Sequence, residues 1–367
     1  MEKLHHLGLL FLNFGVLNIL LSLCLFLASA AGRRFIGSPY IKSRLFFLAL
    51  FAPPALSAVT IFSSFAPPLF VKIPGKAMFC LNKPYCYIFS LISPEEIPLF
   101  DGLLITAVAL AVIPVIYSII SIRSYLRAYA TIHNLTDPSS PALLKVEGIR
   151  TDVLKELKEL SATCKIGVKV IETPCVLSFI WGYFSNILVL STGALKTLSR
   201  KELRCLLAHE LSHCKRRDNI LKGFLLLCRN SLFIFPQVHY LLRWWRGEIE
   251  LIGDEDAART TGSPLDVASA LLKMKRTPYS GIARDLAPYA IGFSMDPDDQ
   301  LFTDRVERLI AISDGRIRPE NNRWSIIPSE IGLLAGMASM FPLSFIVISR
   351  LDPLLVHCYL EKLTNLL

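Results

Sequence analysis

Two histidines and a glutamate in the segment LLAHELSHCKRRDN, residues 206–219, have the types and the spacing of a zinc-hydrolase centre. On a helix, His209 and His213 share one face, with Cβ atoms about 5–6 Å apart. Two imidazoles at that separation can bind one tetrahedral zinc ion. Glu210 points about 100° away from His209 around the helix, so we expect it to accept a proton from water at the metal. The alternative is that these are ordinary polar residues on a charged helix.

A third metal ligand is predicted in the segment EIELIGDEDAA, residues 248–258. Glu250 would complete a His-His-Glu site that holds one zinc ion per chain and leaves one coordination position open. Asp254 follows one helical turn later and would hydrogen-bond the far nitrogen of a ligand histidine. Asp218 is a second candidate for such a supporting role. Glu248 competes with Glu250 as the ligand, and the four-residue spacing to Asp254 favours Glu250.

The elements around these residues have recognisable signals. Ser199 and Glu202 fit a capping box at the start of a helix that carries HELSH. An apolar stripe at helical spacing follows on that helix, at Leu203, Leu206, Leu207, Ala208 and Leu211. The preceding residues 166–195 are rich in Val, Ile and Phe with turn residues between them, which predicts a small sheet of about three strands. A helix is predicted over 150–163.

Four apolar runs contain no charged residue, at 7–31, 45–71, 103–122 and 331–349. Each is long enough to cross about 30 Å of hydrocarbon as a helix. They predict a multi-pass α-helical membrane protein, with the first run retained and not cleaved as a signal peptide. The net charge of +9 fits basic inner loops better than nucleic-acid binding, for which the sequence has no motif.

The predicted organisation follows from these runs. Residues 1–122 form three transmembrane helices with a short outer loop at 72–102, and residues 123–329 form a cytoplasmic zinc peptidase domain. Residues 330–367 form the last span and a short outer tail. Cys80 and Cys86 lie in the outer loop, and a disulfide between them is left open.

The apolar segment 220–242 is predicted to stay on one side of the bilayer. A complete crossing would carry the chain about 30 Å away, and His213 and Glu250 must meet at one ion. We therefore expect an interfacial segment or helical hairpin, bent near Pro236, that belongs to the zinc domain. The alternative is a buried core helix.

The segments HELSHCKRRD and ELIGD, the latter followed shortly by Ala257, resemble those of the gluzincin membrane peptidases. The M56 (BlaR1/MecR1-like) group is the most similar and the M48 (HtpX/Ste24-like) group is next. The four-span layout and DRVERLI, residues 304–310, also resemble the BlaR1-like receptors. The resemblance implies an α+β gluzincin-like domain. An extracellular penicillin-binding domain is not expected after the last span, so β-lactam sensing is not implied.

The function predicted from these features is that of a zinc-dependent endopeptidase in the cytoplasmic membrane. Its substrates would be cytoplasmic or membrane-proximal polypeptides, cleaved in signal-triggered proteolysis. The resemblance implies that the substrate lies along an edge strand, which we expect near Ile187 and Val189. Its partners would be a polypeptide substrate and the lipid bilayer, without nucleic acid.

A rival hypothesis is a membrane signal transducer or scaffold with a structural zinc ion and no protease activity. Glu210 disfavours it, because a structural site gains nothing from that carboxylate. A transporter is a weaker hypothesis, because no predicted span carries an internal charge. The sequence leaves open the substrate, the trigger, self-cleavage, the oligomeric state and the choice between the M56 and M48 groups.

Overall fold

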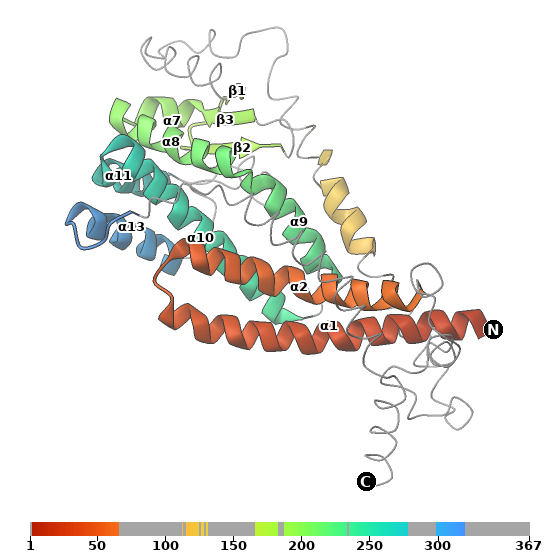
Figure 1. Ribbon diagram of the computed structural model, residues 1–367. Helices are drawn as coiled ribbons and strands as arrows, with labels where there is room; N and C mark the ends of the chain where they lie inside the picture. The colour runs from red at the N-terminus through yellow and green to blue at the C-terminus, as the bar shows by residue number, and fades with distance from the viewer. Residues whose placement is uncertain are drawn as a thin grey trace.

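The computed structural model of the chain describes residues 2–65, parts of 112–130, and residues 166–182, 187–232, 235–277 and 299–319. The described part of the chain is mostly helical and contains one small sheet (Figure 1). The helices are α1 (Glu2–Phe35), α2 (Pro39–Phe65), α7 (Thr192–Thr197), α8 (Arg200–Arg216), α9 (Asp218–Ser231), α10 (Pro236–Thr261), α11 (Pro264–Arg276) and α13 (Asp299–Ser313). The strands are β1 (Gly167–Ile171), β2 (Ser178–Trp181) and β3 (Ile187–Ser191). The outer loop 72–102 with its two cysteines, the helix predicted over 150–163 and the last span lie outside the described residues.

Helices α1 and α2 form a long antiparallel hairpin, with a turn at residues 36–38 (Figure 1). Within the part of the chain that the structure describes, Asn18–Phe35 of α1 is the stretch long and apolar enough to cross a membrane. Its outward leucines, including Leu20, Leu23 and Leu27, are exposed. Residues 45–65 of the predicted second span lie in α2, and of the predicted third span the structure describes Val115–Ser124 as a shorter apolar helix. The four-span topology therefore stays a prediction.

The described sheet has the strand order β1-β3-β2, with β1 parallel and β2 antiparallel to β3. Val189 in β3 stands opposite Lys169 in β1 and Phe179 in β2. The prediction that Ile187 and Val189 belong to an edge strand is therefore wrong, because both sides of β3 are already paired. The physical reason is burial: β3 is an unbroken apolar run that is covered on both faces, as in an inner strand. The strand beside α8 at the edge of the described sheet is β2.

Helix α8 starts and stops at defined local signals. The predicted capping box is confirmed: the Ser199 hydroxyl accepts from the Glu202 backbone N–H, and the Glu202 carboxylate accepts from the Ser199 N–H. Lys273 and Ser269 of α11 also bind that carboxylate, at 2.6 Å each. The helix ends at Arg217, whose φ of 54° lies in the left-handed region, and α9 begins at the next residue. Helices α8 and α9 are therefore joined by this one residue.

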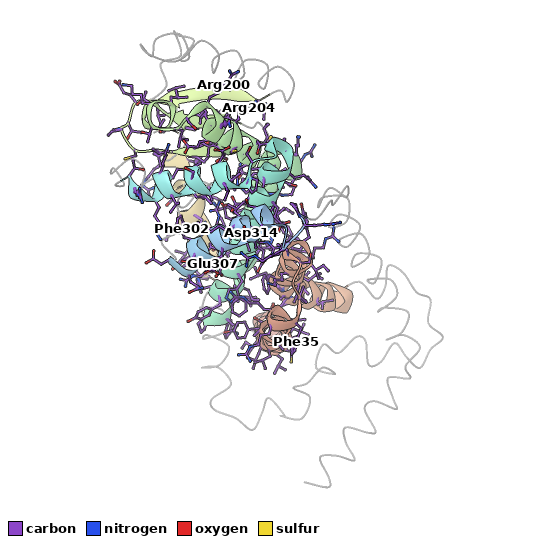
Figure 2. The ribbon with its side chains drawn as sticks, turned by 90° about the vertical axis from the view of Figure 1, so that its left-hand side faces the viewer. Phe35, Arg200, Arg204, Phe302, Glu307 and Asp314 are labelled. Atoms are coloured by element: carbon purple, nitrogen blue, oxygen red, sulfur yellow. The ribbon has the colours of Figure 1, made fainter. Side chains whose placement is uncertain are left out.

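Helix α10 belongs to two hydrophobic cores. Its C-terminal part packs with the sheet, α8, α11 and α13, where Ala257 and Val267 are fully buried. Its N-terminal part packs with α1, α2 and α9, where Trp245 and Phe46 are fully buried. Figure 2 shows Arg200 and Arg204 near the sheet, Phe35 near the turn of the α1–α2 hairpin, and Phe302, Glu307 and Asp314 on or just after α13. The single helix α10 therefore connects the apolar α1–α2 hairpin to the sheet domain.

The segment 220–242 folds as two helices, α9 and the start of α10, and Pro236 occupies the first turn of α10. Pro is suited to that position because its missing N–H would have no partner inside the helix. The two helices contact each other, so the chain reverses between them. The place of this segment relative to a bilayer stays a prediction.

Candidate metal centre

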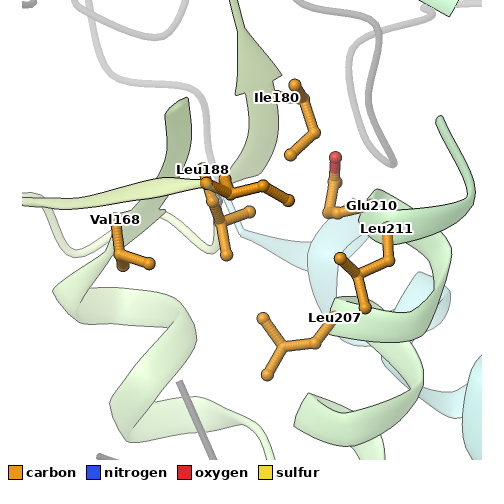
Figure 3. A pocket seen from close by; sticks show the side chains of 7 residues that line it. Val168, Ile180, Leu188, Leu207, Glu210 and Leu211 are labelled. Carbon is orange, nitrogen blue, oxygen red and sulfur yellow. The ribbon is translucent and has the colours of Figure 1, made fainter. Parts of the chain in front are cut away.

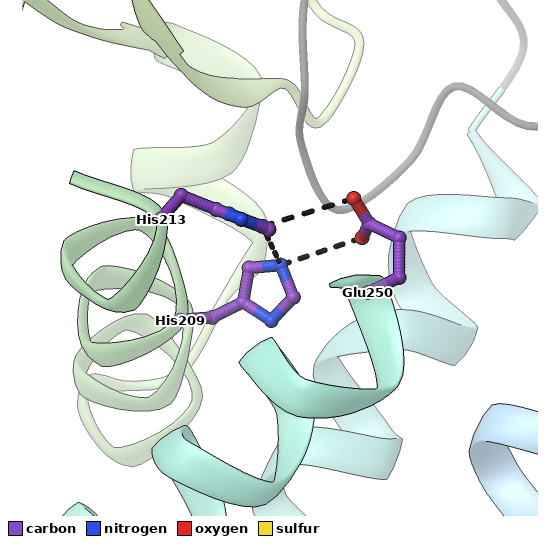
Figure 4. Close-up of side chains that lie close together, drawn as sticks. All are labelled: His209, His213 and Glu250. Carbon is purple, nitrogen blue, oxygen red and sulfur yellow. Dashed lines mark hydrogen bonds and ion pairs between the residues drawn. The ribbon is translucent and has the colours of Figure 1, made fainter. Parts of the chain in front are cut away.

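Helices α8 and α10 bring the side chains of His209, His213 and Glu250 to one point (Figure 4). The two Nε2 atoms are 2.9 Å apart. The Glu250 carboxylate places Oε2 at 3.4 Å from His209 Nε2, and Oε1 at 3.7 Å from His213 Nε2. All three side chains are buried. Three donors of the kind that zinc prefers therefore face one another inside the fold.

The far nitrogens of both rings are held by carboxylates. His209 Nδ1 lies 3.0 Å from Asp254 Oδ1, and His213 Nδ1 lies 2.7 Å from Asp218 Oδ2. When each Nδ1–H donates to its carboxylate, each Nε2 presents a lone pair toward Glu250. Two lone pairs and a carboxylate at this spacing repel one another unless a positive charge lies among them. The four residues thus have the arrangement expected of two ligand histidines with their supporting carboxylates.

Arg305 of α13 completes the polar shell from a third element. It donates to both carboxylate oxygens of Asp254, at 2.6 Å from Nε and 2.8 Å from Nη2. Its Nη1 is 3.0 Å from Glu250 Oε2. The sequence resemblance had singled out DRVERLI without giving this arginine a role. A guanidinium fork of this kind holds two carboxylates in fixed positions.

Gly253 is required where α10 passes closest to His209. A Cβ atom at this position would lie 2.7 Å from His209 Cε1 and 2.9 Å from its Nδ1. Only a glycine lets the imidazole lie flat against the α10 backbone, between Glu250 and Asp254. Sequence reasoning missed this role, although the signal was visible as a glycine in the middle of a helical segment.

The charges of the shell favour a cation at its centre. Burial opposes ionisation of His209, but its contacts with Asp254 and Glu250 outweigh burial and raise its pKa to about 9. Burial likewise disfavours the charged form of Glu250, but Arg305 and then His209 hold the pKa of that carboxyl far below its usual range. The pKa of His213 is lowered, first by burial and also by the charge of His209. The centre therefore keeps a carboxylate ionised at neutral pH.

The geometry fits a divalent metal ion. Two atoms bound at 2.0–2.1 Å to one tetrahedral ion lie about 3.3 Å apart. The three observed separations, 2.9, 3.4 and 3.7 Å, bracket that value. Two imidazoles and one carboxylate are also the ligand set of many catalytic zinc sites, which keep a fourth position for water or substrate. His209, His213 and Glu250 are thus the residues that would hold the ion.

Glu210 faces a different direction, toward the sheet. Its carboxylate is buried at the wall of a small pocket between α8 and the strands (Figure 3). The rest of the lining is aliphatic: Ile166, Val168, Ile180, Leu188, Leu207 and Leu211. Glu210 thus lies next to His209 in sequence and beside an apolar pocket in space. An apolar group that enters this pocket would come close to a carboxylate.

The outer edge of β2 lies beside the start of α9. The Asn219 side-chain amide donates to Ile180 O at 3.0 Å and to Gly182 O at 2.9 Å. Asn219 directly follows Asp218, which binds His213. The edge strand and the metal centre are therefore connected through two consecutive residues of α9.

Glu248, the rival for the ligand position, points elsewhere. One of its oxygens lies 3.8 Å from Lys42 Nζ of α2. Burial raises the pKa of Glu248 to about 7, although Lys42 and Arg33 oppose the shift. The structure thus places Glu250, and not Glu248, beside the two histidines. The metal-binding and proton-transfer roles themselves remain predictions.

Comparison with known proteins places the chain among peptidases. The family model described as BlaR1 peptidase M56 matches residues 91–280, just over half of the 367-residue chain. The regulatory protein BlaR1 of Bacillus licheniformis is 32% identical over 130 residues, which are 34% of this chain and 22% of that protein. A protease HtpX homolog of Helicobacter acinonychis (strain Sheeba) is 28% identical over 113 residues, 28% of this chain and 37% of that protein. In both cases the match spans well under half of the relative's length.

Proposed function

The chain belongs to the BlaR1 peptidase M56 family, and from that premise we propose that it is a membrane-anchored, zinc-dependent endopeptidase. The observation that carries the proposal is the convergence of His209, His213 and Glu250 from two helices, with Glu210 on the adjoining face of α8. A site that only stabilised the fold would use four protein ligands and would need no such carboxylate.

In the proposed reaction, zinc supplies a Lewis acid that polarises the scissile carbonyl and makes water acidic enough to react near neutral pH. Glu210 accepts the proton of the attacking water and later donates it to the leaving amine. Asp254 and Asp218 keep the imidazoles of His209 and His213 in the tautomer that presents Nε2. Arg305 keeps the Glu250 carboxylate ionised and fixed.

The substrate in this proposal is an extended polypeptide. Its backbone lies beside β2, the edge strand of the described sheet nearest to α8, and an aliphatic side chain enters the pocket at Glu210. Support comes from the aliphatic lining of that pocket and from the position of Asn219 between β2 and the centre. Main-chain hydrogen bonds between the substrate and the edge strand give affinity for any sequence. The pocket gives specificity, because it accepts only some side chains.

We further propose the location of the catalytic domain. The apolar stretch Asn18–Phe35 of α1 and the basic residues near the α1–α2 turn support a cytoplasmic side for the zinc domain; these basic residues include Arg33, Arg34, Lys42 and Arg44. Substrates would then be cytoplasmic or membrane-proximal polypeptides, cleaved in response to a signal. Reporter fusions at residues 215 and 250 should report the same side of the bilayer, and opposite sides would refute this topology together with the metal triad.

The central test is Glu210→Gln in the full chain, purified in detergent or reconstituted in lipid vesicles. We expect one zinc ion per chain to remain and cleavage of labelled casein, or of the chain itself, to fall by about 10³-fold or more because the proton acceptor is lost. His209→Ala serves as the control that should lose both zinc and cleavage. Cleavage at the wild-type rate by Glu210→Gln would refute the peptidase mechanism and favour a zinc-dependent signal transducer.

A further inference from the structure

Tyr40, on the first turn of α2, reaches a residue of the zinc domain. Its hydroxyl donates to Asp256 Oδ1 of α10 at 3.3 Å, although the two residues are 216 positions apart in sequence. Tyr40 is only 4% exposed and its ring belongs to the core formed by α1, α2, α9 and α10. A buried phenol needs a hydrogen-bond partner, and here the partner is a carboxylate of the helix that also carries Glu250.

Asp256 is in turn connected to the metal centre. Its second oxygen accepts from Arg216 Nη1 of α8 at 2.8 Å. Arg216 also donates to Asp218, at 2.7 Å from Nη2 and 3.1 Å from Nε. Asp218 Oδ2 is the atom that holds His213 Nδ1. An unbroken series of four contacts thus runs from α2 through α10, α8 and α9 to one of the two histidines.

This series is enclosed in the fold. Arg216 is 6% exposed, Asp218 is fully buried, and the Asp256 side chain is 16% exposed. Charged groups that water does not reach interact over a longer range and more strongly than on a surface. If Arg216 breaks its hydrogen bond to Asp256, its hydrogen bonds to Asp218 must change as well, because one planar guanidinium binds both carboxylates. The orientation of Asp218 therefore depends on where Asp256 and Tyr40 hold Arg216.

We propose that Tyr40 and Asp256 are positioning residues for the metal ligand His213, and that they make the metal affinity of the site depend on the packing of α2 against α10. This inference rests on the proposed function, since it takes His213 as a metal ligand. Tyr40 precedes the part of the chain matched by the family model. The contact would let the helix hairpin adjust the centre without touching it.

The physical effect is a change in ligand geometry. Movement of α2 away from α10 removes the Tyr40 donor that helps to hold the Asp256 carboxylate in place, so Asp256 anchors Arg216 Nη1 less firmly. The Arg216 guanidinium can then turn and release part of its contact with Asp218, so the His213 ring is held less firmly. A ligand imidazole with a looser outer hydrogen bond binds its metal more weakly.

The test measures metal affinity in the full chain in lipid nanodiscs, by competition between the protein and a zinc chelator, and records the visible spectrum with Co²⁺ in place of zinc. Tyr40→Phe keeps the buried ring and removes only the donor, and we expect about three- to tenfold weaker zinc binding with a shifted Co²⁺ spectrum. Asp256→Asn should weaken zinc binding about tenfold. The double variant should bind no more weakly than Asp256→Asn alone, because both changes act on one series of contacts.

Lys42→Met is the matched control. Lys42 lies on the same helix and also faces α10, at 3.8 Å from Glu248, but it is not in the series. It should leave zinc affinity and the Co²⁺ spectrum unchanged. Zinc affinity in Tyr40→Phe equal to that of wild type, in a chain where His213→Ala abolishes binding, would overturn this inference and leave the proposed function intact. A chain in which His213→Ala binds zinc as tightly as wild type would overturn both.

Discussion

Arg305 binds Asp254 through two parallel hydrogen bonds, of 2.6 and 2.8 Å, although the two residues are 51 positions apart in sequence. The pair connects α13 to α10 next to the candidate metal centre, and the third nitrogen of the guanidinium lies 3.0 Å from Glu250 Oε2. One arginine thus fixes both the proposed carboxylate ligand and the carboxylate that orients His209.

From this contact we predict that Arg305→Leu weakens zinc binding about 10- to 100-fold, because Glu250 and Asp254 lose their common partner and two buried carboxylates repel each other. Arg305→Lys should recover only part of the affinity, since an ammonium cannot form the fork. Chelator competition measures both values. Arg308→Leu is the control: Arg308 lies one turn further on α13 and binds Glu255 instead, so zinc affinity should stay at the wild-type value.

A second prediction concerns the close approach of α10 to His209. Gly253→Ala adds a Cβ atom 2.7 Å from His209 Cε1, so either the ring or the helix must move. We expect at least tenfold weaker zinc binding and a loss of about 1–3 kcal/mol in the free energy of unfolding. Gly247→Ala, on the same helix, places its Cβ 3.0 Å from the flexible tip of Leu301 and should have little effect on zinc. Equal zinc affinities for the two variants would contradict the packing role of Gly253.

A third prediction concerns the pH dependence of stability. Burial raises the pKa of Glu248 from 4.5 to about 7 in the folded chain. The folded state therefore binds this proton more tightly than the unfolded state, and the stability linked to it is present below pH 4.5 and is lost as pH rises toward 7. Glu248→Gln should remove this dependence, so that its advantage over wild type grows to at most about 3 kcal/mol by pH 8.

Thermal melting in detergent from pH 4.5 to 8 measures this difference. A gap between Glu248→Gln and wild type that stays constant over the range would show that Glu248 does not titrate there. Lys42→Met should change the pH dependence of stability in the opposite direction to Glu248→Gln. It removes the cation that favours ionised Glu248, so the loss of stability with rising pH should become larger.

A fourth prediction concerns a buried amine. Lys222 of α9 is 3% exposed, and its Nζ has no hydrogen-bond partner among the described residues. Burial, and then the charge of Arg246, lower its pKa well below the ordinary value. Lys222→Met keeps the length of the side chain and removes the polar group, so we expect a gain of about 1–2 kcal/mol in stability. Lys273→Met should act in the opposite direction, since Lys273 binds Glu202 at 2.6 Å. Destabilisation by Lys222→Met would indicate a partner for the amine.

The placement of residues and the start of α8 were predicted correctly from the sequence where the signal lies within one helix. HELSH and the capping box at Ser199 lie on one helix, and helical spacing alone places His209 and His213 together. The preference for Glu250 over Glu248 also rested on spacing, and the structure places Glu250 beside the histidines. These features require only the geometry of one helix and one further turn.

The features that sequence reasoning missed depend on pairing between distant segments. Arg305 contacts Glu250 and Asp254 from α13, and Tyr40 contacts Asp256 from α2. No local pattern specifies a partner more than 50 residues away. The error over β3 is different. Its unbroken apolar run was a signal for an inner strand, and the alternation expected at an edge was absent. Because β2 is also fully buried, burial alone could not show which of β2 and β3 is the inner strand. The strand order became clear only from the hydrogen-bonded pairs.

The position of Asn219 has a consequence for any peptide that approaches β2. The carbonyl groups of Ile180 and Gly182 already accept hydrogen bonds from one side-chain amide, so pairing at these two positions is an exchange and not an addition. An incoming strand must present backbone N–H groups to both carbonyl oxygens in order to replace the Asn219 amide. An unrelated chain that meets this edge of β2 finds the two carbonyl groups already hydrogen-bonded. This disfavours non-specific strand pairing and aggregation at the edge.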